Sequence, residues 1–514
     1  MSAINIVVTR MRHKRGANFA LSSKTENVGR DAFVSGRARK QKLGEQIAHK
    51  IVDDIIARGW IEGDTLGTER DLRLRYSISR ATFREAVRQV ERHGAATTRR
   101  GVGGGLVVLA RPRGAAIRAM MTFLELTRVS FGEQHEVHEQ LELTAARLAS
   151  QRIDDESRSE MLAALEQLEQ TSSVVDSVAN NMRIRVAIAK ATRNPSLPLF
   201  IETLNGVLRD ILRVLRVEES VFLRDREQST RFKKELVDTI LAGRDKDAER
   251  LVRQDVYRRL LAMTTPMTSS RGRRGIANYF EELPDWFESQ NIDLKLSERV
   301  AFAIVEDIER AGCVEGTNLG NEAALQKKHS VSRAVLREAL RQLELHGVVH
   351  VKSGVQGGVL IGRPDSTYTE EVVCTYLRTT EIAALHLWET QSTLEVLAVE
   401  KLAGTASEPD CTALRNALSY LGQASVEDFL ARSMVLHGTI ADRTGNRALS
   451  LFIRILLRFG IHALPPIDPA KLPWLMRRHD RLVEAICAHD AVEARREITL
   501  LFNESRIWVG GHHL

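Results

Sequence analysis

The sequence predicts a mostly α-helical chain that contains the same unit twice. Residues 79–94 read SRATFREAVRQVERHG and residues 332–347 read SRAVLREALRQLELHG, so eleven of sixteen positions are identical. Apolar residues recur at helical spacing around both segments, and 514 residues are too many for one hydrophobic core. These observations together predict several helical domains arranged as a tandem repeat.

The repeated segment predicts a capped helix with two different faces. A hydroxyl at Ser79 or Ser332 can accept a hydrogen bond from a free amide of the first turn. One face carries arginine at three helically spaced positions in each copy, and the opposite face is apolar. The arginines are residues 80, 84, 88, 333, 337 and 341, and the apolar residues of the first copy are Phe83, Val87 and Val90. A solvated charged face is the alternative to a binding face.

Composition favours an intracellular protein with a polyanionic partner. The net charge is +7, which favours nucleic acid without proving it. The four cysteines are scattered without a CxxC pair, which argues against a zinc ribbon or a disulfide framework and fits a reducing cytosol. No segment resembles a signal peptide, and no apolar run approaches the length of a membrane span. We therefore expect a cytoplasmic protein that does not enter a membrane.

The first copy begins with three helices and a hairpin. Apolar residues at every fourth position from Leu43 to Ile55 predict the first helix, and Gly59 and Gly63 mark its end. A second short helix is expected after Thr68, and the repeated segment forms the third. The run TTRRGVGGGLVVLA at 97–110 predicts two strands around glycines. This order is that of a winged helix-turn-helix domain.

The second copy follows the first without an insertion in this region. Residues 43 and 296, 69 and 322, 80 and 333, and 101 and 354 all lie 253 positions apart. Such a long, constant period indicates duplication of a whole protein instead of a short structural repeat. Each winged domain is followed by amphipathic helical sequence, in which Glu142 aligns with Glu395 and Asp245 with Asp490.

We divide the chain accordingly into six parts. These are a flexible basic arm (1–38), a first winged helix-turn-helix domain (39–111), a first all-helical domain (112–263), a linker (264–292), a second winged helix-turn-helix domain (293–363) and a second all-helical domain (364–514).

The first winged domain resembles a known family of bacterial proteins. The series Gly63-Asp64-x-Leu66, Glu69-Arg70-x-Leu72, Ser79-Arg80, Arg84-Glu85-Ala86 and Gly94 resembles the DNA-binding domain of GntR-type transcription regulators. The helical domains are similar to the effector-binding (FCD) domain of the FadR branch. Ordinary members have one copy and dimerise, so this chain resembles two fused protomers.

The resemblance implies that the third helix enters the major groove and that the wing lies over the minor groove. Arginine suits both places because it grips guanine or phosphate with two donors. Ala323 and Ser353 replace Arg70 and Arg100 in the second copy, which implies unequal half-sites or weaker binding by that copy. The implied DNA-binding residues are Arg70, Ser79, Arg80, Thr82, Arg84, Arg99, Arg100, Gly101, Arg333, Val335, Arg337, Lys352 and Gly354.

The metal site of the branch is incomplete in both helical domains. Metal-binding members use one aspartate and three histidines, but those positions hold Asn181, Arg185, Lys234 and Val256 in the first copy. The second copy has Ser433, His437, His479 and Leu501. Because a stable zinc site has at least three protein ligands, His437 and His479 are either part of an incomplete Zn²⁺ site in the second copy or a buried histidine pair.

Fixed positive charge replaces the metal ligands of the first copy. A buried cation needs a partner, which for Arg185 and Lys234 is either the carboxylate of an effector or an internal Glu or Asp. His138 and Gln391 stand where the family has an arginine that grips carboxylates. The implied effector-binding residues are His138, Asn181, Arg185, Lys234, Gln391, Ser433, His437 and His479.

The leading hypothesis is a sequence-specific transcription regulator, acting as a repressor. Its two winged domains would bind a pseudo-palindromic operator in double-stranded DNA as an intramolecular pseudo-dimer, while the helical domains sense a small molecule such as an organic acid. The sequence leaves open whether two chains pair further, which would bring together four winged domains. The alternatives are a non-specific architectural DNA-binding protein and an enzyme. No catalytic residue is assigned, because the chain has no Gly-rich phosphate loop, nucleophile elbow or HExxH motif.

Overall fold

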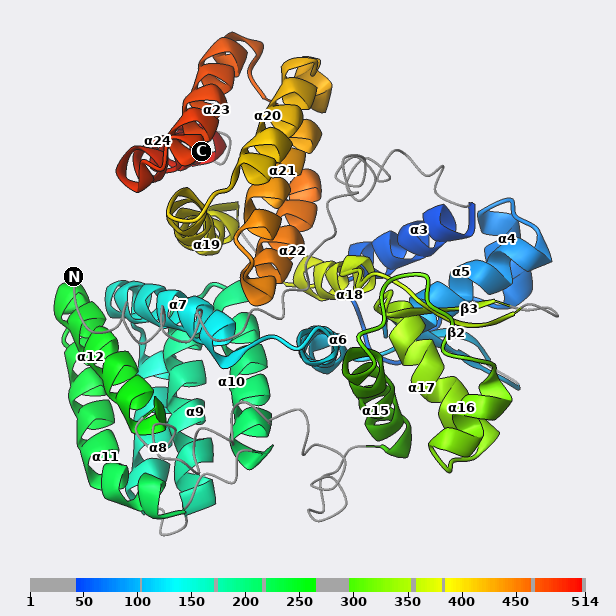
Figure 1. The fold of residues 1–514 in the computed structure, drawn as a ribbon, viewed down its shortest axis with the longest axis horizontal. Coiled ribbons are helices and arrows are strands. Elements are labelled where there is room, and N and C mark those ends of the chain that lie inside the picture. Colours follow the sequence, from blue (N-terminus) through cyan, green and yellow to red (C-terminus); the bar gives the residue numbers. More distant parts are fainter. Residues whose placement is uncertain are drawn as a thin grey trace.

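The computed structural model describes residues 43–101, 104–170, 174–214, 219–264, 295–352, 357–380, 384–463 and 467–510. Most of these residues are helical, and the strands form two small antiparallel sheets (Figure 1). The expected N-terminal arm, and the linker beyond Thr264, lie outside the described ranges. None of the described helices is both long and apolar enough to cross a membrane.

The first winged domain, head one, consists of α3 (Leu43–Ala57), α4 (Glu69–Arg75), α5 (Arg80–Arg92), β1 (Ala96–Arg99) and β2 (Gly105–Val108). The apolar stripe of α3 and that of α5 form its core, which Leu72 and the inner face of the hairpin complete. The tight turn between α4 and α5 places Ser77 in the left-handed region, with φ 52°.

The second winged domain, head two, repeats this arrangement in α15 (Leu296–Arg310), α16 (Glu322–Lys328), α17 (Arg333–Leu345), β3 (Val349–Lys352) and β4 (Gly358–Ile361). Ala96 pairs with Val108 in head one, and Val349 pairs with Ile361 in head two, so the hairpins share one register. Ser330 has the same left-handed conformation as Ser77, with φ 51°. The 253-residue period therefore extends to backbone detail.

Two helical halves follow the heads. The first half contains α6 (Arg113–Leu126), α7 (Phe131–Arg152), α8 (Asp155–Gln170), α9 (Val174–Ala191), α10 (Ser196–Val214), α11 (Glu219–Leu241) and α12 (Asp245–Thr264). The second half contains α18 (Thr367–Arg378), α19 (Ala384–Ala403), α20 (Glu408–Gly422), α21 (Val426–Arg443), α22 (Arg447–Ala463), the short 3₁₀ helix η2 (Pro469–Lys471), α23 (Leu472–Cys487) and α24 (Ala491–Gly510). The expected mostly helical fold, with two winged domains and two helical domains, is confirmed.

The two helical halves contact each other through equivalent residues. Phe200 of α10 stacks on Phe452 of α22 with ring centroids 4.2 Å apart. The Asn194 amide donates to the carbonyl of His386, at 2.7 Å, and the Asn446 amide donates to that of Glu133, at 2.9 Å. Because these contacts are reciprocal and the buried apolar residues of both halves form one cluster, the halves share a single core.

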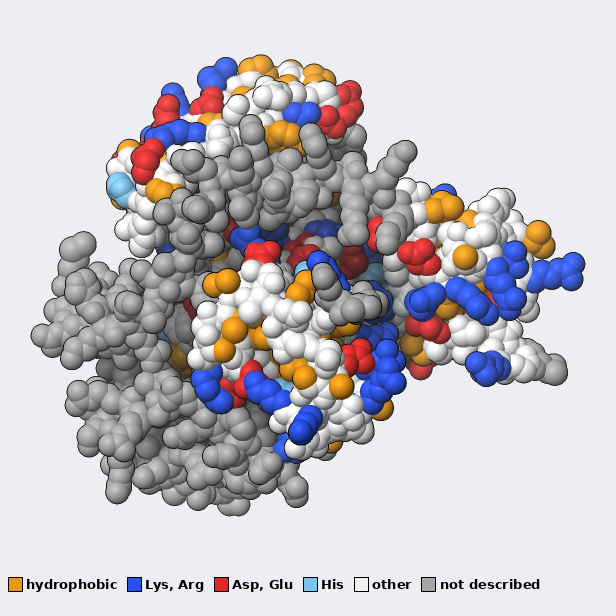
Figure 2. Space-filling model, turned by 45° about the vertical axis from the view of Figure 1, so that its right-hand side comes forward, with side chains coloured by type: hydrophobic (Ala, Val, Ile, Leu, Met, Phe, Trp, Pro, Cys, Tyr) orange, Lys and Arg blue, Asp and Glu red, His pale blue; other side chains and the backbone are white. Residues whose placement is uncertain are grey.

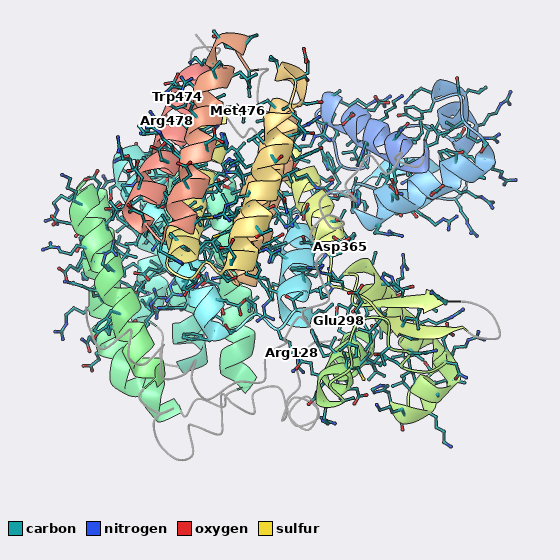
Figure 3. The ribbon with its side chains drawn as sticks, turned by 45° about the horizontal axis from the view of Figure 1, so that its top comes forward. Arg128, Glu298, Asp365, Trp474, Met476 and Arg478 are labelled. Carbon is teal, nitrogen blue, oxygen red and sulfur yellow. The ribbon has the colours of Figure 1, made fainter. Side chains whose placement is uncertain are left out.

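The heads contact the helical halves in a crossed manner. Arg378, at the end of α18 in the second half, pairs with Asp53 of head one. Arg128, which follows α6 of the first half, pairs with Glu309 of head two (Figure 3). Helices α6 and α18 pack on each other between the heads and the helical halves (Figure 1). Both heads consequently lie side by side at one end of the molecule.

Candidate DNA-binding and effector sites

Helices α5 and α17, the third helices of the two heads and the candidate recognition helices, begin at the predicted serine caps. The Ser79 hydroxyl accepts from the amide of Thr82 at 3.1 Å, and the Ser332 hydroxyl accepts from the amide of Val335 at 3.3 Å. The apolar faces of α5 and α17 are buried in their heads, as the repeated stripe predicts. The arginine faces are therefore turned away from both cores.

The arginines of these faces are exposed, and the first arginine of each helix pairs with an acidic residue of the preceding short helix. Arg80 leaves 64% of its side chain exposed and its Nε lies 3.0 Å from Glu69 of α4. In head two, the equivalent Glu322 contacts Arg333 at 3.7 Å and Arg337 at 3.3 Å. Exposed ion pairs of this kind are worth about 0–1 kcal/mol, so DNA phosphate can replace the glutamate at little cost.

The wings are held against the recognition helices by matching hydrogen bonds. The amide of Thr98 donates to Glu91 at 2.9 Å, and the amide of Val351 donates to Glu344 at 2.8 Å. Gly101 follows β1 with φ 101° and open space around its α-carbon, a conformation that suits glycine near a wing tip. Gly354, the matching residue of head two, lies outside the described residues.

The remaining expected DNA-binding residues lie on the surface of the heads. Thr82 and Val335 are half-buried, and Arg84 and Arg70 are exposed. Arg99, Arg100 and Lys352 extend from the hairpins and are exposed. Figure 2 shows Lys and Arg side chains gathered on this end of the molecule. The surface can therefore neutralise phosphates along a duplex.

The second half contains a cavity of about 100 Å³ between α19, α21, α23 and α24. Its wall is largely apolar, and its polar groups include Gln391, Ser433, His437, Lys471 and His479. Lys471 also pairs with Glu504 of the cavity wall, with Nζ 2.7 Å from the carboxylate. An apolar cavity with a few converging polar groups is the usual form of a small-molecule site.

The two cavity histidines form a chain of hydrogen bonds. His479 donates from Nδ1 to the carbonyl of Leu475 at 2.7 Å, so its Nε2 is an acceptor. His437 Nε2 lies 3.2 Å from this atom and donates to it, while His437 Nδ1 contacts Glu395. Burial, and then the neighbouring His437, lower the pKa of His479 to about 3, which keeps the ring neutral.

These residues do not fit a structural zinc ion. The lone pair of His479 Nε2 is already engaged by His437, and the two further family positions hold Ser433 and Leu501. The Ser433 hydroxyl donates to the Leu430 carbonyl at 2.8 Å. Among the described residues, no cluster of three His, Cys, Asp or Glu side chains could hold a metal. The alternative reading, a buried histidine pair, describes the observed geometry.

In the first half, a buried network of charges replaces the histidine chain. The Arg185 Nε lies 3.2 Å from Glu142, and Arg259 donates to the same carboxylate at 2.6 Å. Lys233 lies 2.8 Å from Asp255, and both side chains are at most 2% exposed. Burial by itself raises the pKa of Glu142, but Arg259 and Arg185 hold it well below its ordinary value. Arg185 thus has the internal partner that was one of its two expected alternatives.

The structure does not place Lys234 in the buried network with Arg185; Lys234 lines an open surface hollow between α11 and α12. Its side chain is 58% exposed and lies 3.4 Å from Glu169, whereas its neighbour Lys233 is buried. Leu236 and Leu482 lie 246 positions apart, but Asp245 and Asp490 lie 245 apart, because the loop before α12 has one extra residue. Counting back from the aspartates therefore selects Lys234 instead of Lys233, and one residue turns a helix side chain by about 100°.

The other expected effector residues divide between the two halves. His138 is buried, its Nε2 lies 3.1 Å from Glu142, and burial lowers its pKa to about 3. Asn181 accepts from the Ser229 hydroxyl at 3.2 Å. Gln391 donates to Glu395 at 2.7 Å. Glu142 and Glu395 are thus the centres of the two sites. The sequence aligned these two glutamates but indicated no role for either.

Comparison with known proteins identifies each part of the chain. The family model for "Bacterial regulatory proteins, gntR family" matches residues 43–105 and 296–359, and the model for "FCD domain" matches 133–258 and 386–504. The HTH-type transcriptional repressor NanR of Enterobacter sp. (strain 638) is 26% identical over 222 residues, which cover 42% of this chain and 85% of NanR. An uncharacterized HTH-type transcriptional regulator of Mycobacterium tuberculosis is 28% identical over 162 residues, 31% of this chain and 66% of that protein.

Solved structures of two bacterial proteins align with part of this chain. Streptococcus agalactiae GntR aligns with 41% of this chain and 98% of its own length, at 20% identity and a TM-score of 0.35. E. coli McbR/YncC aligns with 43% of this chain and its whole length, at 16% identity and a TM-score of 0.23. The chain belongs to the GntR family of bacterial transcription regulators and contains two gntR-type DNA-binding domains and two FCD domains.

Proposed function

We propose that this regulator is a repressor that binds a pseudo-palindromic operator as an intramolecular pseudo-dimer. The observation that carries the proposal is the presence of two exposed arginine faces, on α5 and α17, in heads that lie side by side in one chain (Figure 1). The repressor names of the NanR relatives support the sign of regulation. Such a regulator acts on the bacterial chromosome in the cytoplasm.

Each head contributes a recognition helix and a wing to the proposed interface. Arg80 and Arg84 of α5, and Arg333 and Arg337 of α17, are the major-groove candidates, since all four are exposed. Glu69 pairs with Arg80, and Glu322 pairs with Arg333 and Arg337. A bidentate arginine contact with guanine is worth about 1–3 kcal/mol of discrimination. The wing and cap residues named from the family resemblance contact the backbone in this proposal.

The heads differ, so the proposed half-sites are related but unequal. Thr82 offers a hydroxyl where Val335 offers only methyl groups, and Arg70 has Ala323 as its counterpart. Fusion permits the two heads to differ, because each head is encoded separately in one chain, whereas the protomers of a homodimer are identical. It also makes the second half-site contact intramolecular, so no monomer–dimer equilibrium limits operator binding.

The FCD domains suit a small-molecule effector, and we assign its site to the cavity of the second half. Lys471, His437 and Gln391 line that cavity together with apolar side chains, so a small organic acid with an apolar body would bind there by displacing Glu504 from Lys471. The first half instead has a carboxylate of its own, Glu142, between Arg185 and Arg259. An effector changes repression only through unequal affinity for DNA-competent and incompetent arrangements.

Selection from a random DNA pool followed by binding titrations tests the DNA-binding function. We expect enrichment of duplexes with two related half-sites, and we expect Arg80→Ala combined with Arg333→Ala to weaken binding to them by about 2–6 kcal/mol, from one lost base contact per head. The control is Arg415→Ala combined with Arg495→Ala, which removes the same charge from exposed positions of the second half.

The same titration separates the alternatives. A non-specific architectural protein would bind selected and random duplexes equally at every salt concentration, whereas a regulator binds its operator more tightly. Retained operator affinity in the recognition-helix double variant would contradict the assignment of α5 and α17. We propose no catalytic activity, in agreement with the family of the chain.

A further inference from the structure

Helix α18 touches the C-terminal ends of both recognition helices. These ends are marked by equivalent histidines, His93 after α5 and His346 after α17, each of which is only 3% exposed. The ring of Tyr368, in the first turn of α18, lies 6.4 Å from the ring of His93 and 5.6 Å from that of His346. One side chain therefore lies between the two reading heads.

Polar contacts tie each head to the same turn of α18. Glu371 lies 3.4 Å from His93 Nε2, and the Tyr368 hydroxyl lies 3.4 Å from the carbonyl of Arg92 in head one. In head two, Asp365 lies just before α18 (Figure 3), and its amide donates to the His346 carbonyl at 2.9 Å. Arg378 adds an ion pair with Asp53 of head one, so the attachment extends along α18.

The equivalent helix of the first half, α6, cannot provide the same link. At the matching positions, 253 residues earlier, Ala115 replaces Tyr368 and Arg118 replaces Glu371. A methyl group does not reach between two histidine rings, and a guanidinium group does not attract an imidazole as a carboxylate does. The link through Tyr368 and Glu371 therefore has no counterpart in α6, which contacts head two differently, through Phe123, whose ring lies 6.0 Å from that of His346.

The second half also joins this link to its cavity. Arg458 of α22 donates from Nε to Glu370 at 2.9 Å and lies 3.5 Å from Glu371. Its neighbour Leu457 lines the cavity. The matching residue of α10 in the first half, 252 positions earlier, is Gly206, which has no side chain to make such a pair. Contacts therefore run from Arg458, which follows a cavity residue in the chain, through Glu371 to His93.

From these contacts we infer that Tyr368 and Glu371 are positioning residues that hold the two heads at one separation and so determine the half-site spacing that the protein selects. The inference rests on the proposed function, because spacing has meaning only for a two-half-site operator. Neither side chain lies on the arginine faces, so each acts on recognition through the recognition helices and not through DNA.

The test uses duplexes that contain the same two selected half-sites separated by spacers of increasing length. For the full chain, affinity peaks at one spacing and falls when one base pair is added, since each base pair also turns the second site around the duplex axis. Tyr368→Ala combined with Glu371→Ala reduces affinity at the best spacing by about tenfold and flattens the profile, because a loosely held head has a lower effective concentration. Affinity for a duplex with a single half-site stays unchanged.

Two further variants make the test specific. Tyr368→Phe keeps the ring between the histidines and retains the wild-type spacing profile, which provides a rescue if the alanine variant does not fold. Tyr420→Ala removes a tyrosine that lies over Arg432 in the second half and leaves the profile unchanged. If the double variant Tyr368→Ala with Glu371→Ala kept the sharp spacing profile of the wild type, the inference would be overturned, but the proposed function would stand. Failure of the wild-type chain to select any two-half-site duplex would overturn the proposed function and the inference with it.

Discussion

Glu142 and Glu395 are equivalent residues in different surroundings. Glu142 is 6% exposed and faces Arg185 and Arg259, whose charges are permanent. Glu395 is 3% exposed and faces Gln391 and His437 instead of guanidinium groups. The carboxylate of the first site therefore balances two fixed charges, whereas Gln391 and His437 of the second site carry no permanent charge.

Replacing each glutamate by glutamine measures this difference. Glu142→Gln leaves two buried guanidinium groups without a full countercharge, so we expect the free energy of unfolding to fall by about 3–5 kcal/mol. Glu395→Gln is the matched control, and we expect a loss of about 1–2 kcal/mol, because the amide can still form hydrogen bonds and no guanidinium group loses its countercharge. Urea denaturation followed by circular dichroism measures both, and equal losses would contradict the proposed contrast.

The same network makes stability depend on pH in the acid range. The pKa values of Glu142 and Asp255 are held below their ordinary values of 4.5 and 3.8, since Arg259, Arg185 and Lys233 outweigh the effect of burial. The unfolded chain then binds more protons than the folded chain below pH 4.5, so the stabilisation is fully present above that pH and is lost as the pH falls. We expect the urea concentration at the midpoint of unfolding to decrease as the pH is lowered below 4.5. In Glu142→Gln this decrease should be less steep.

At the scale of elements, the recognition helices combine a local cap with a tertiary clamp. Their first turns are closed by Ser79 and Ser332, and their acidic residues Glu91 and Glu344 hold the wings. The cap follows from local sequence alone. The hydrogen bonds between each glutamate and its wing require the hairpin to fold back on the helix, which depends on the tertiary structure.

Substitution of the caps measures their local contribution. Ser79→Ala or Ser332→Ala leaves a first-turn amide without its acceptor, and we expect the stability of the affected head to fall by about 1 kcal/mol. Ser79→Gly is the control, because glycine at the N-cap lowers stability by only about a few tenths of a kcal/mol. Hydrogen exchange of the α5 and α17 amides follows each head separately. A glycine variant less stable than the alanine variant would argue against capping.

At the scale of the whole molecule, the two halves behave as one folding unit because they share a core. Phe200 and Phe452 are fully buried against each other, and the reciprocal contacts of Asn194 and Asn446 lie beside the same interface. The heads are then attached across the repeat, since α18 of the second half contacts head one and α6 of the first half contacts head two. Neither half is thus independent of the other.

Phe200→Ala tests this coupling. Removing the ring leaves a cavity at the junction of the halves, and we expect a loss of about 3–5 kcal/mol in the free energy of unfolding. Because Phe452 loses its stacking partner, the second half should be destabilised as well, and fluorescence of Trp388 and Trp474 in that half should report a lower denaturation midpoint. An unchanged midpoint for these tryptophans, with loss of helix elsewhere, would show that the halves unfold separately.

Much of the fold is determined by local sequence. The apolar stripe of residues 43–55, the serine caps and the glycines of the hairpin each specify an element by its own periodicity or backbone requirement. The repeat then duplicates the prediction, and the 253-residue period is visible in hairpin register and in the left-handed Ser77 and Ser330. The exposure of the arginine faces follows from the apolar residues opposite them.

Only the tertiary structure decided which side chains meet. The sequence grouped Lys234 with Arg185, but a one-residue difference in a loop makes Lys233 the buried residue, because helix faces change with every residue. It left open the partner of Arg185, which is Glu142, since the choice between ligand and side chain depends on distance. Nor did it show that Tyr368 lies between His93 and His346, because packing of helices far apart in the chain brings those rings together.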